Sequence, residues 1–513
     1  MKRLFLFVFL LLPLFGITST IPIYAAEQTD SVHSEEEVSK IGLPIIRIQT
    51  KNGEEPTCER IEHPEGCIGQ SITNNNYVKG QMTIHIGDEL LYNSGEYEKK
   101  KSGMRIKVRG NTSADFPCKS FKIKTEVKTD LFNRNDDKYK SRSWVLLNLY
   151  STRDLRTILG CYVAKLIGID WEPEHEFVNL FLNGEYRGLY MLSESVEASD
   201  GRCQLNDDTG LLMEADPYWW NEDDDEPVIK TKYLPYTLGY TFKSPDLAVD
   251  DPMLKEIEDY FNAFEDSLYN GKDISKYADL KYFAAWILTH DLLGTSDGAG
   301  ANMYIMKNDF KDGEERYSTK LHMGPLWDFD SLLETPSKWC TCHDIGFYYY
   351  GELFKRPEFI NEYYNLWMSI HEDIASKAVS YIKDFVSKYG AAIDESRKIA
   401  PPDPWVWRKT TADNLKEIED WFNERIPWLD SAISELFIKT NISQTDYNID
   451  SEITSATIYN VNGQVCGKLN GNDTERIFKH HKFEKRSLNI PSGTYILRTV
   501  FADGNSMSQK ITM

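Results

Sequence analysis

Two carboxylates and one amide, spaced along neighbouring segments, are the first residues in this sequence that suggest chemistry. Asp297 lies in the glycine-bearing stretch "TSDGAGANMY", and Asn302 follows five residues later at the start of a predicted strand. Asp328 comes on the next apolar strand, in "HMGPLWDFDS". In phosphotransferases one carboxylate orients the accepting hydroxyl, while an amide and a second carboxylate hold Mg²⁺ against the nucleotide phosphates. The alternative interpretation is that these residues cap turns through local hydrogen bonds.

A phosphotransferase also needs positive charge for the phosphates, and one predicted strand supplies it. Lys122 and Lys124 share one face of the strand "KSFKIKT", and Arg109 precedes that strand in "RIKVRG". Glu194 lies just past another predicted strand, where an ion pair would fix a lysine near the phosphates. We expect Lys122, nearer the middle of its strand, to pair with Glu194. The alternative is that each is a surface charge on an edge strand.

The elements that position these residues change from strands to helices along the chain. Between residues 41 and 125, apolar and polar residues alternate between turn signals, which predicts strands. A helix is predicted near 153–167, followed by a hairpin whose turn is Asn183–Gly184. The acidic and aromatic stretch 214–250 is predicted to be a solvated loop. Apolar periodicity predicts further helices at 252–268, 276–293, 356–388 and 411–436.

The two ends of the chain differ in composition from its centre. Residues 1–25 combine Lys2 and Arg3 with an apolar run and small residues, as in a secretory signal peptide. Residues 26–40 are polar and acidic, which predicts a flexible leader. Residues 446–513 contain two strand pairs with Asn-Gly and Asp-Gly turns, which predicts a small C-terminal β-sandwich.

Export changes the interpretation of the 8 cysteines, because disulfides persist in oxidising compartments. Cys58 and Cys67 bracket a short turn-rich loop and are the best candidates for a disulfide bond. Cys340 and Cys342 lie in "KWCTCHD", beside His343, but this stretch lacks the second half of a zinc motif.

The charge of the chain limits its partners. With 58 Lys and Arg against 80 Asp and Glu, the formal net charge is -22, which argues against a nucleic-acid partner. An acidic protein attracts basic partners, so a basic substrate is expected. After the signal peptide, no segment is apolar enough to be predicted as a transmembrane span.

Five ordered stretches together resemble the CotH family of spore-coat and secreted atypical protein kinases. These stretches are "RIKVRGNTS…FPCKSFKIK", "SWVLLNLYSTRDLRTILG", "LFLNGEYRGLYMLSE", "DGAGANMYIMKN" and "GPLWDFD". The resemblance implies an α+β fold over residues 41–440, with a β-rich N-lobe and a helical C-lobe like those of protein kinases. It also implies that Asp297 is the catalytic acid and that Asn302 and Asp328 are Mg²⁺ ligands.

The resemblance further implies a phosphate-binding lysine within "KSFKIK", with Glu194 as its partner. We expect this lysine to be Lys122, with Lys124 as the second candidate, because Cys118 stands where the family usually has a lysine. The family also commonly has a glycine shortly after "WDFD", where this chain has "SLLET". Asp330, two residues after Asp328, is a further candidate for the metal site.

The C-terminal residues resemble a second kind of domain. The stretches "IYNVNGQ" and "IPSGTYIL" and the last strand, around Lys510, are similar to the sorting domains of type IX secretion cargo. This resemblance implies a route through the periplasm to the cell surface or the medium, with secretion machinery as a partner.

The sequence therefore predicts a secreted protein kinase with ATP and Mg²⁺, or Mn²⁺, as cofactors. Its acceptors would be Ser and Thr hydroxyls of exported or surface proteins. A different class of function is an inactive kinase fold that serves as an adhesion or binding protein, since fold does not fix function. The aromatic stretches "YWW" and "FYYY" leave a third interpretation open, binding of polysaccharide.

Overall fold

A computed structural model defines the fold of the chain. It describes residues 33–65, 67, 71–73, 76–148, 154–222, 225–295, 297–298, 300–401, 409–443, 453–460, 464–470, 494–501 and 506–512. The predicted signal peptide lies outside the described residues, as does the first part of the predicted leader. The described end of the leader forms helix α1 (Glu35–Ser39), where Ser34 and Glu37 cap the first turn reciprocally.

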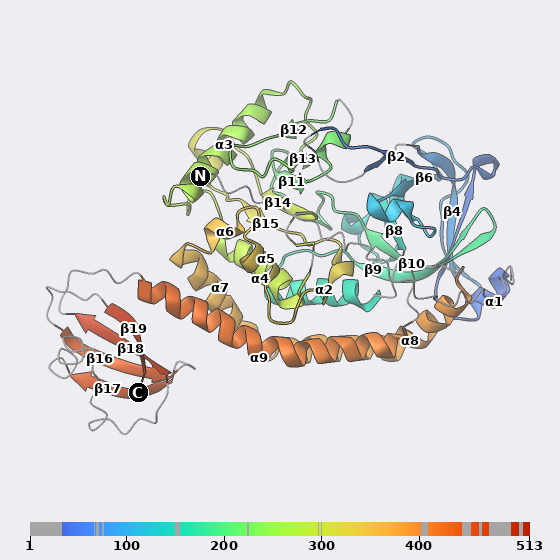
Figure 1. Cartoon of the computed structure of the whole chain (residues 1–513). Helices are drawn as coiled ribbons and strands as arrows, with labels where there is room; N and C mark the ends of the chain where they lie inside the picture. Colours follow the sequence, from blue (N-terminus) through green and yellow to red (C-terminus); the bar gives the residue numbers. More distant parts are fainter. Residues whose placement is uncertain are drawn as a thin grey trace, which may run out of the picture.

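The N-terminal part of the chain forms an eight-stranded sheet with the strand order β1-β9-β10-β8-β7-β6-β4-β5 (Figure 1). Its strands are β1 (Ile45–Thr50), β4 (Val78–Ile86), β5 (Glu89–Asn93), β6 (Met104–Arg109), β7 (Ser120–Thr129), β8 (Ser141–Asn148), β9 (His175–Leu182) and β10 (Glu185–Glu194). A short hairpin, β2 (Glu59–Ile61) with β3 (Ser71–Thr73), precedes β4. Buried and half-buried residues alternate along β6, so one face of the sheet packs into a core around Ile106 and Trp144. The strands predicted between residues 41 and 125 are confirmed.

A second sheet of five strands has the order β12-β13-β11-β14-β15. Its strands are β11 (Leu211–Asp216), β12 (Val228–Ile229), β13 (Gly239–Ser244), β14 (Met303–Lys307) and β15 (His322–Met323). The prediction of a solvated loop over 214–250 is therefore wrong in part. The strands there are no longer than six residues, and the acidic run between them hid their alternation.

Helices cover the five-stranded sheet and form the rest of the domain (Figure 1). They are α2 (Asp154–Ile167), α3 (Pro252–Tyr269), α4 (Leu280–Leu293), α5 (Thr341–Ile345), α6 (Tyr350–Leu353), α7 (Pro357–Ile370), α8 (Ile374–Ile399) and α9 (Thr411–Ser443). Short 3-10 helices lie between them and the strands: η1 (Lys51–Gly53), η2 (Thr112–Asp115), η3 (Asp137–Tyr139), η5 (Trp219–Asn221), η6 (Gly313–Tyr317) and η7 (Phe329–Ser331). The predicted helix at 356–388 is two helices with a break before α8, and α9 continues through Pro427.

Helix α4 is buried on every side, from Phe283 to Leu293, and occupies the centre of the largest core cluster. The fold is thus α+β, with a sheet-rich N-terminal part and helices towards the C-terminal end.

Helix α8 connects the helical part to the eight-stranded sheet. Near its C-terminal end, the Ser396 side chain accepts a hydrogen bond of 3.1 Å from Asn179 in β9. Tyr186, at the start of β10, donates a bond of 2.7 Å to the same asparagine. The sheet is therefore attached to the helical part both by the chain after β10 and by this helix.

The described C-terminal residues form an antiparallel sheet with the order β17-β16-β18-β19, which follows α9 (Figure 1). Its strands are β16 (Ile453–Asn460), β17 (Val465–Asn470), β18 (Thr494–Phe501) and β19 (Ser506–Thr512). The two predicted hairpin turns lie outside the described residues. The β-sandwich over 446–513 stays a prediction, because the described strands there make a single sheet.

The structure corrects the prediction of a disulfide bond. Cys58 and Cys67 are not bonded to each other and are free thiols. Cys58 instead packs against the core of the eight-stranded sheet, with its thiol 3.7 Å from the Ala114 carbonyl.

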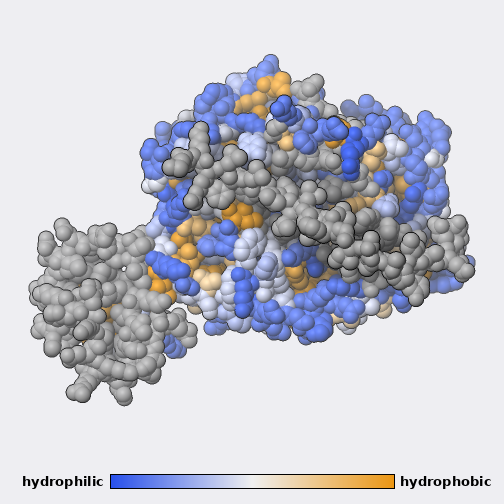
Figure 2. All heavy atoms as spheres, viewed as in Figure 1, coloured by the Kyte–Doolittle hydropathy of each residue, from blue (hydrophilic) through white to orange (hydrophobic). Residues whose placement is uncertain are grey.

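The helices in the described part of the chain include none that is long and apolar enough to cross a membrane. Figure 2 shows hydrophilic residues over most of the described surface on one face, with hydrophobic residues in small separate patches.

Candidate functional site

The loop after α4 presents Asp297. The helix ends at Gly294, whose φ of 58° lies in the left-handed region that glycine adopts without strain. Gly298 packs against the ring of His290, and a Cβ atom there would lie 2.6 Å from His290 Nδ1. Tyr350 donates a hydrogen bond of 3.0 Å to the Gly298 carbonyl. These contacts fix the loop while leaving the Asp297 side chain exposed.

Asn302 and Asp328 lie in loops that flank the adjacent strands β14 and β15. Asn302 directly precedes β14, as predicted, and has a left-handed φ of 57°. Asp328 does not lie on a strand, because β15 has only two residues and ends at Met323. It lies in the following loop, immediately before η7, with a φ of 65° and an exposed side chain.

The structure brings Asp297, Asp328 and Arg109 together. Partial desolvation, and then the negative charge of Asp328, raise the pKa of the Asp297 carboxyl group, whereas the nearby Ser331 hydroxyl lowers it. Desolvation also raises the pKa of Asp328, and the positive charge of Arg109 opposes this. The Arg109 guanidinium lies over the Trp327 ring, 5.7 Å from its centroid. The two carboxylates therefore lie close together, with Arg109 near Asp328.

These residues fit a hard divalent cation in their donor chemistry. Asp328 and Asn302 offer carboxylate and amide oxygens, and a cation beside them would relieve the repulsion between Asp328 and Asp297. Among the described residues, no group of three or more His, Cys, Asp or Glu side chains is placed to hold a metal ion. Phosphate oxygens and water would therefore complete the coordination, as Mg²⁺ commonly requires.

The side chain of Asp330 is exposed, and its role as a metal ligand stays a prediction. Its backbone carbonyl accepts a hydrogen bond of 3.4 Å from Arg156 Nη1. Asp330 thus connects the Asp328 loop to helix α2.

A cluster of cations lies on the face of the eight-stranded sheet that is turned away from its own core. Lys122 is directly opposite Lys107 in the β6–β7 ladder, and Lys124 is opposite Arg105. Within the described part of the chain, Lys122 has no hydrogen-bonding or ion-pair partner. Its pKa is lowered to about 7, first by desolvation and then by the surrounding positive charges, including those of Lys124, Lys107 and Arg109. In a chain whose net charge is -22, such a cluster indicates an anion-binding site.

Glu194 does not pair with Lys122, so that prediction is wrong. Lys122 is opposite Val145, which is opposite Ser193, so these three side chains share one face. Glu194 is one residue further along β10 and is opposite Trp144 on the other face. Because side chains alternate between the faces of a strand, a shift of one residue moves Glu194 to the far side of the sheet.

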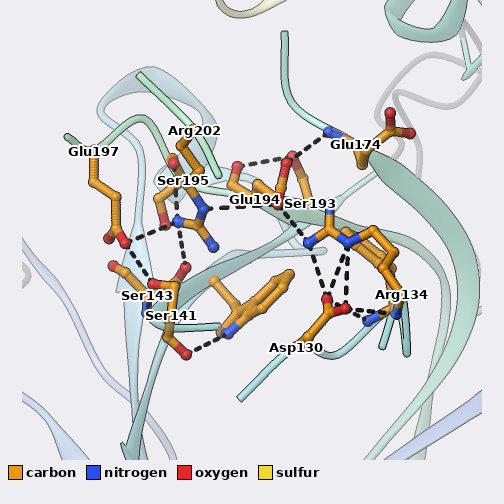
Figure 3. Close-up of polar contacts among 12 residues, drawn as sticks. Asp130, Arg134, Ser141, Ser143, Glu174, Ser193, Glu194, Ser195, Glu197 and Arg202 are labelled. Carbon is orange, nitrogen blue, oxygen red and sulfur yellow. Dashed lines mark hydrogen bonds and ion pairs between the residues drawn. The ribbon is translucent and has the colours of Figure 1, made fainter. Parts of the chain in front are cut away.

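Glu194 is instead held by arginines, as Figure 3 shows. Its Oε1 atom lies 2.7 Å from Arg134 Nη2 and 3.7 Å from Arg202 Nε. Its Oε2 atom accepts a hydrogen bond of 3.1 Å from the Glu174 amide. The carboxylate is completely buried, and Arg134 also pairs with Asp130. This buried network secures the end of β10 where the chain passes to the second sheet.

An apolar cluster joins the two sheets next to the cations. Val145, which lies beside Lys122 in the ladder, packs with Leu212 of β11 and Met306 of β14. Val196 and Ala198, in the connection after β10, pack against this cluster. The face that carries Lys122 is therefore apolar near the connection and cationic farther from it.

The sequence analysis missed an ion pair on the second sheet. Lys243 Nζ, at the end of β13, lies 3.1 Å from Glu214 Oε2 in β11. Burial and the charge of Glu214 raise the pKa of nearby Asp216 to about 7, while Lys243 lowers it. Lys243 also contributes to the lowered pKa of Lys122, so the pair lies near the cation cluster. The alternation of "LLMEAD" and "GYTFKS" was the available signal for these strands.

Comparison with known proteins places the chain in a family. A search of curated proteins finds no significant match. The family model described as CotH kinase protein matches residues 106–429, which is more than half of the chain and includes every predicted site residue. The matched range extends from within β6 into α9, and thus contains Lys107, Lys122, Lys124, the Asp297 loop and the Asp328 loop. The chain belongs to the CotH kinase family.

Proposed function

We propose that this protein is a protein kinase that transfers the γ-phosphoryl group of ATP to Ser and Thr hydroxyls, with Mg²⁺ as cofactor. The observation that carries the proposal is the placement of Asp297 near Asp328, with Arg109 near Asp328 and the unpartnered Lys122 near Arg109. A turn-capping role for the two aspartates would not require this cation cluster.

The apolar and cationic parts of the Lys122 face suit the two ends of a nucleotide. The base would contact the apolar cluster around Val145 and Val196, next to the connection between the sheets. The phosphates would extend over Lys122 and Lys107 towards Arg109. A phosphate would stabilise the Lys122 ammonium group strongly, because this group is partly desolvated and has no ion-pair partner to compensate its charge.

Each residue of the site then has a chemical role. Asp328 and Asn302 would hold the metal, which when bound neutralises phosphate charge. Asp297 orients the acceptor hydroxyl and takes its proton as the oxygen bonds to the γ-phosphorus. The bond from that phosphorus to the bridging oxygen breaks, and ADP leaves with the electron pair. The pKa of Asp297, raised by desolvation and by the charge of Asp328, makes this carboxylate a stronger base than an ordinary aspartate.

The acceptor that we propose is a basic, Ser- or Thr-containing exported protein. The net charge of -22 supports it, because an acidic surface attracts a basic partner over distance. The signal-peptide-like start and the sorting-like tail support a secreted or cell-surface location. An inactive adhesion protein is the competing function, although it has no need of the ordered set Lys122, Asp297, Asn302 and Asp328.

Phosphoryl transfer with two aspartate variants tests the proposal. Labelled ATP, Mg²⁺ or Mn²⁺ and a basic Ser-rich protein are incubated with the mature chain. Asp297→Asn should keep ATP affinity within a few fold while turnover falls by roughly two or more orders of magnitude. Asp328→Ala should abolish metal-dependent nucleotide binding in calorimetry. Asp312→Asn, at an exposed residue that makes no capping hydrogen bond, is the control. Wild-type turnover by Asp297→Asn would reject the catalytic role and favour the turn-capping interpretation.

A further inference from the structure

The ring of Phe329 lies against helix α2 at a glycine. A Cβ atom on Gly160 would lie 2.3 Å from Phe329 Cγ and 2.4 Å from its Cδ2. No side chain larger than hydrogen fits there unless the ring moves, and Phe329 is only 1% exposed. Gly160 is in the interior of α2, where glycine costs about 0.5–1 kcal/mol relative to alanine. The glycine thus disfavours the helix but permits the contact.

Phe329 also lies near the loop of the other aspartate. Its ring centroid is 6.2 Å from that of His290. The same histidine packs against Gly298, the residue that follows Asp297. The ring therefore lies between α2 and the helix end that carries the Asp297 loop.

Polar contacts on both sides of Asp328 hold the same segment in place. Arg156, one turn before Gly160 in α2, donates to the Asp330 carbonyl and lies 3.3 Å from Glu334 Oε1. On the other side of Asp328, the Leu326 amide donates a hydrogen bond of 3.0 Å to the buried Glu172 carboxyl group. The segment around Asp328 is thus attached to α2 and to the chain that follows it.

The backbone conformation of Asp328 is unfavourable for a residue other than glycine, so the surrounding contacts must stabilise it. Its φ of 65° and ψ of 68° are left-handed, which costs a residue other than glycine roughly 1–2 kcal/mol. Strained conformations of this kind persist only where the surrounding structure determines them. The residue that follows Asp328 is Phe329, whose ring lies against Gly160 of α2.

We propose that Gly160 and Phe329 are positioning residues, whose contact holds Asp328 so that its carboxylate faces Asp297 and Asn302. Neither residue touches the reacting atoms. The inference rests on the proposed function, because it assigns to this contact the placement of the Asp328 metal ligand. Helix α2 thereby influences the geometry of the metal site through the contact between Gly160 and Phe329.

Enlarging the side chain at position 160 and reducing it at position 329, separately and together, tests this inference. The variants are Gly160→Ala, Phe329→Leu and the double variant, each titrated with Mg²⁺ in the presence of a fixed concentration of ATP. Gly160→Ala should weaken the apparent Mg²⁺ affinity at least fivefold, and Phe329→Leu should also weaken it. The double variant should be closer to the wild type than Gly160→Ala alone, because the smaller leucine leaves room for the added methyl group.

Stability measurements separate positioning from general damage. If the ring contact were absent, Gly160→Ala would stabilise the helix and leave the Mg²⁺ response unchanged. Ile84→Ala, in the separate core of the eight-stranded sheet, is the control that lowers thermal stability without altering the Mg²⁺ affinity of the folded protein. If Gly160→Ala does not fold, Phe329→Leu still tests the contact.

The outcomes distinguish this inference from the function on which it rests. Wild-type Mg²⁺ affinity in both single variants, or strictly additive losses in the double variant, would overturn the inference alone. Absence of Mg²⁺-dependent ATP binding in the wild-type protein would overturn the proposed function and the inference together.

Discussion

Arg134 Nη2 lies 2.7 Å from Glu194 Oε1, on the opposite side of the sheet from Lys122. The buried acid of β10 is therefore neutralised by an arginine network and takes no part in holding a lysine. Lys122, for its part, lies on the other face, where its charged neighbours include Lys107, Lys124 and Arg109. Glu194 and the lysine proposed to bind phosphate are thus separated by the thickness of one sheet, which leads to different predictions for the two residues.

Glu194→Ala should destabilise the protein without changing nucleotide affinity. Without Glu194, Arg134 keeps only Asp130 and Arg202 keeps only Glu197 as an ion-pair partner, and loss of one member of a buried ion pair typically costs about 3–5 kcal/mol of unfolding free energy. Denaturant unfolding measures this loss, and ATP binding is measured at a temperature where the variant is folded. A double-mutant cycle should show coupling of Glu194 to Arg134 and none to Lys122. Reduced ATP affinity at unchanged stability would contradict this assignment.

Nucleotide affinity should fall as pH rises through the pKa of Lys122. With a pKa of about 7, this lysine is mostly protonated at pH 6 and mostly neutral at pH 8 in the free protein. Lys122→Arg keeps its charge across this range, so the difference between its pH profile and the wild-type profile isolates Lys122 from the titration of ATP itself. Identical profiles for the two proteins would argue against phosphate binding by Lys122.

Lys122→Met should lower turnover and raise the KM for ATP strongly, whereas Lys124→Met should do so much less. Lys122 is surrounded by cations from both sheets, but Lys124 lies near Tyr77, with its ammonium 5.7 Å from the ring centroid. Steady-state kinetics with ATP as the varied substrate measures both effects. A larger effect of Lys124→Met would transfer the phosphate-binding role to Lys124.

Asp216 should make folding stability decrease as pH rises from about 4 to 7. Its pKa is raised from 3.8 to about 7, so the folded protein binds a proton in this range that the unfolded chain has released. Stability falls with pH wherever the folded state binds more protons. Asp216→Asn should remove this contribution and raise Tm at pH 8, whereas Asp312→Asn should not. Unchanged pH dependence of Tm in Asp216→Asn would contradict the raised pKa.

Deleting residues 446–513 should leave phosphoryl transfer intact but retain the protein in the periplasm. The four-stranded sheet lies after α9 and outside the range that matches the kinase family, so an independent unit is expected there. Activity of the purified truncated chain and its distribution between periplasm and medium are the two measurements. Arrival of the truncated chain in the medium would remove the sorting role.

The sequence predicted elements whose pattern is local. The strands around Lys122 and the hairpin at Asn183 were found because alternation and turn residues are properties of a few adjacent residues. Strands β11 and β13 were missed, and with them Glu214 and Lys243, because short strands beside an acidic run carry little periodicity.

Pairing between distant residues was harder to predict than the elements themselves. Glu194 was predicted to lie on the same face of the sheet as Lys122, but it lies on the other face. A shift of one residue in strand register moves a side chain to the opposite face of the sheet, and the sequence does not specify that register. The contact between Gly160 and Phe329 has no local signal at all, because it depends on how α2 packs on a segment far along the chain.

Strand β10 is held at both of its ends, by α8 near Tyr186 and by the chain that leaves Glu194 for the second sheet. Because β1 pairs with both β9 and β4, the strands from β1 round to β4 close into a ring, and each strand of the ring is held by a ladder on both sides. Lys107 and Lys122 lie opposite each other on two strands of this ring, so the ladder sets the spacing between them. Movement of these cations relative to the Asp297 loop would therefore require the closed sheet to move as one body.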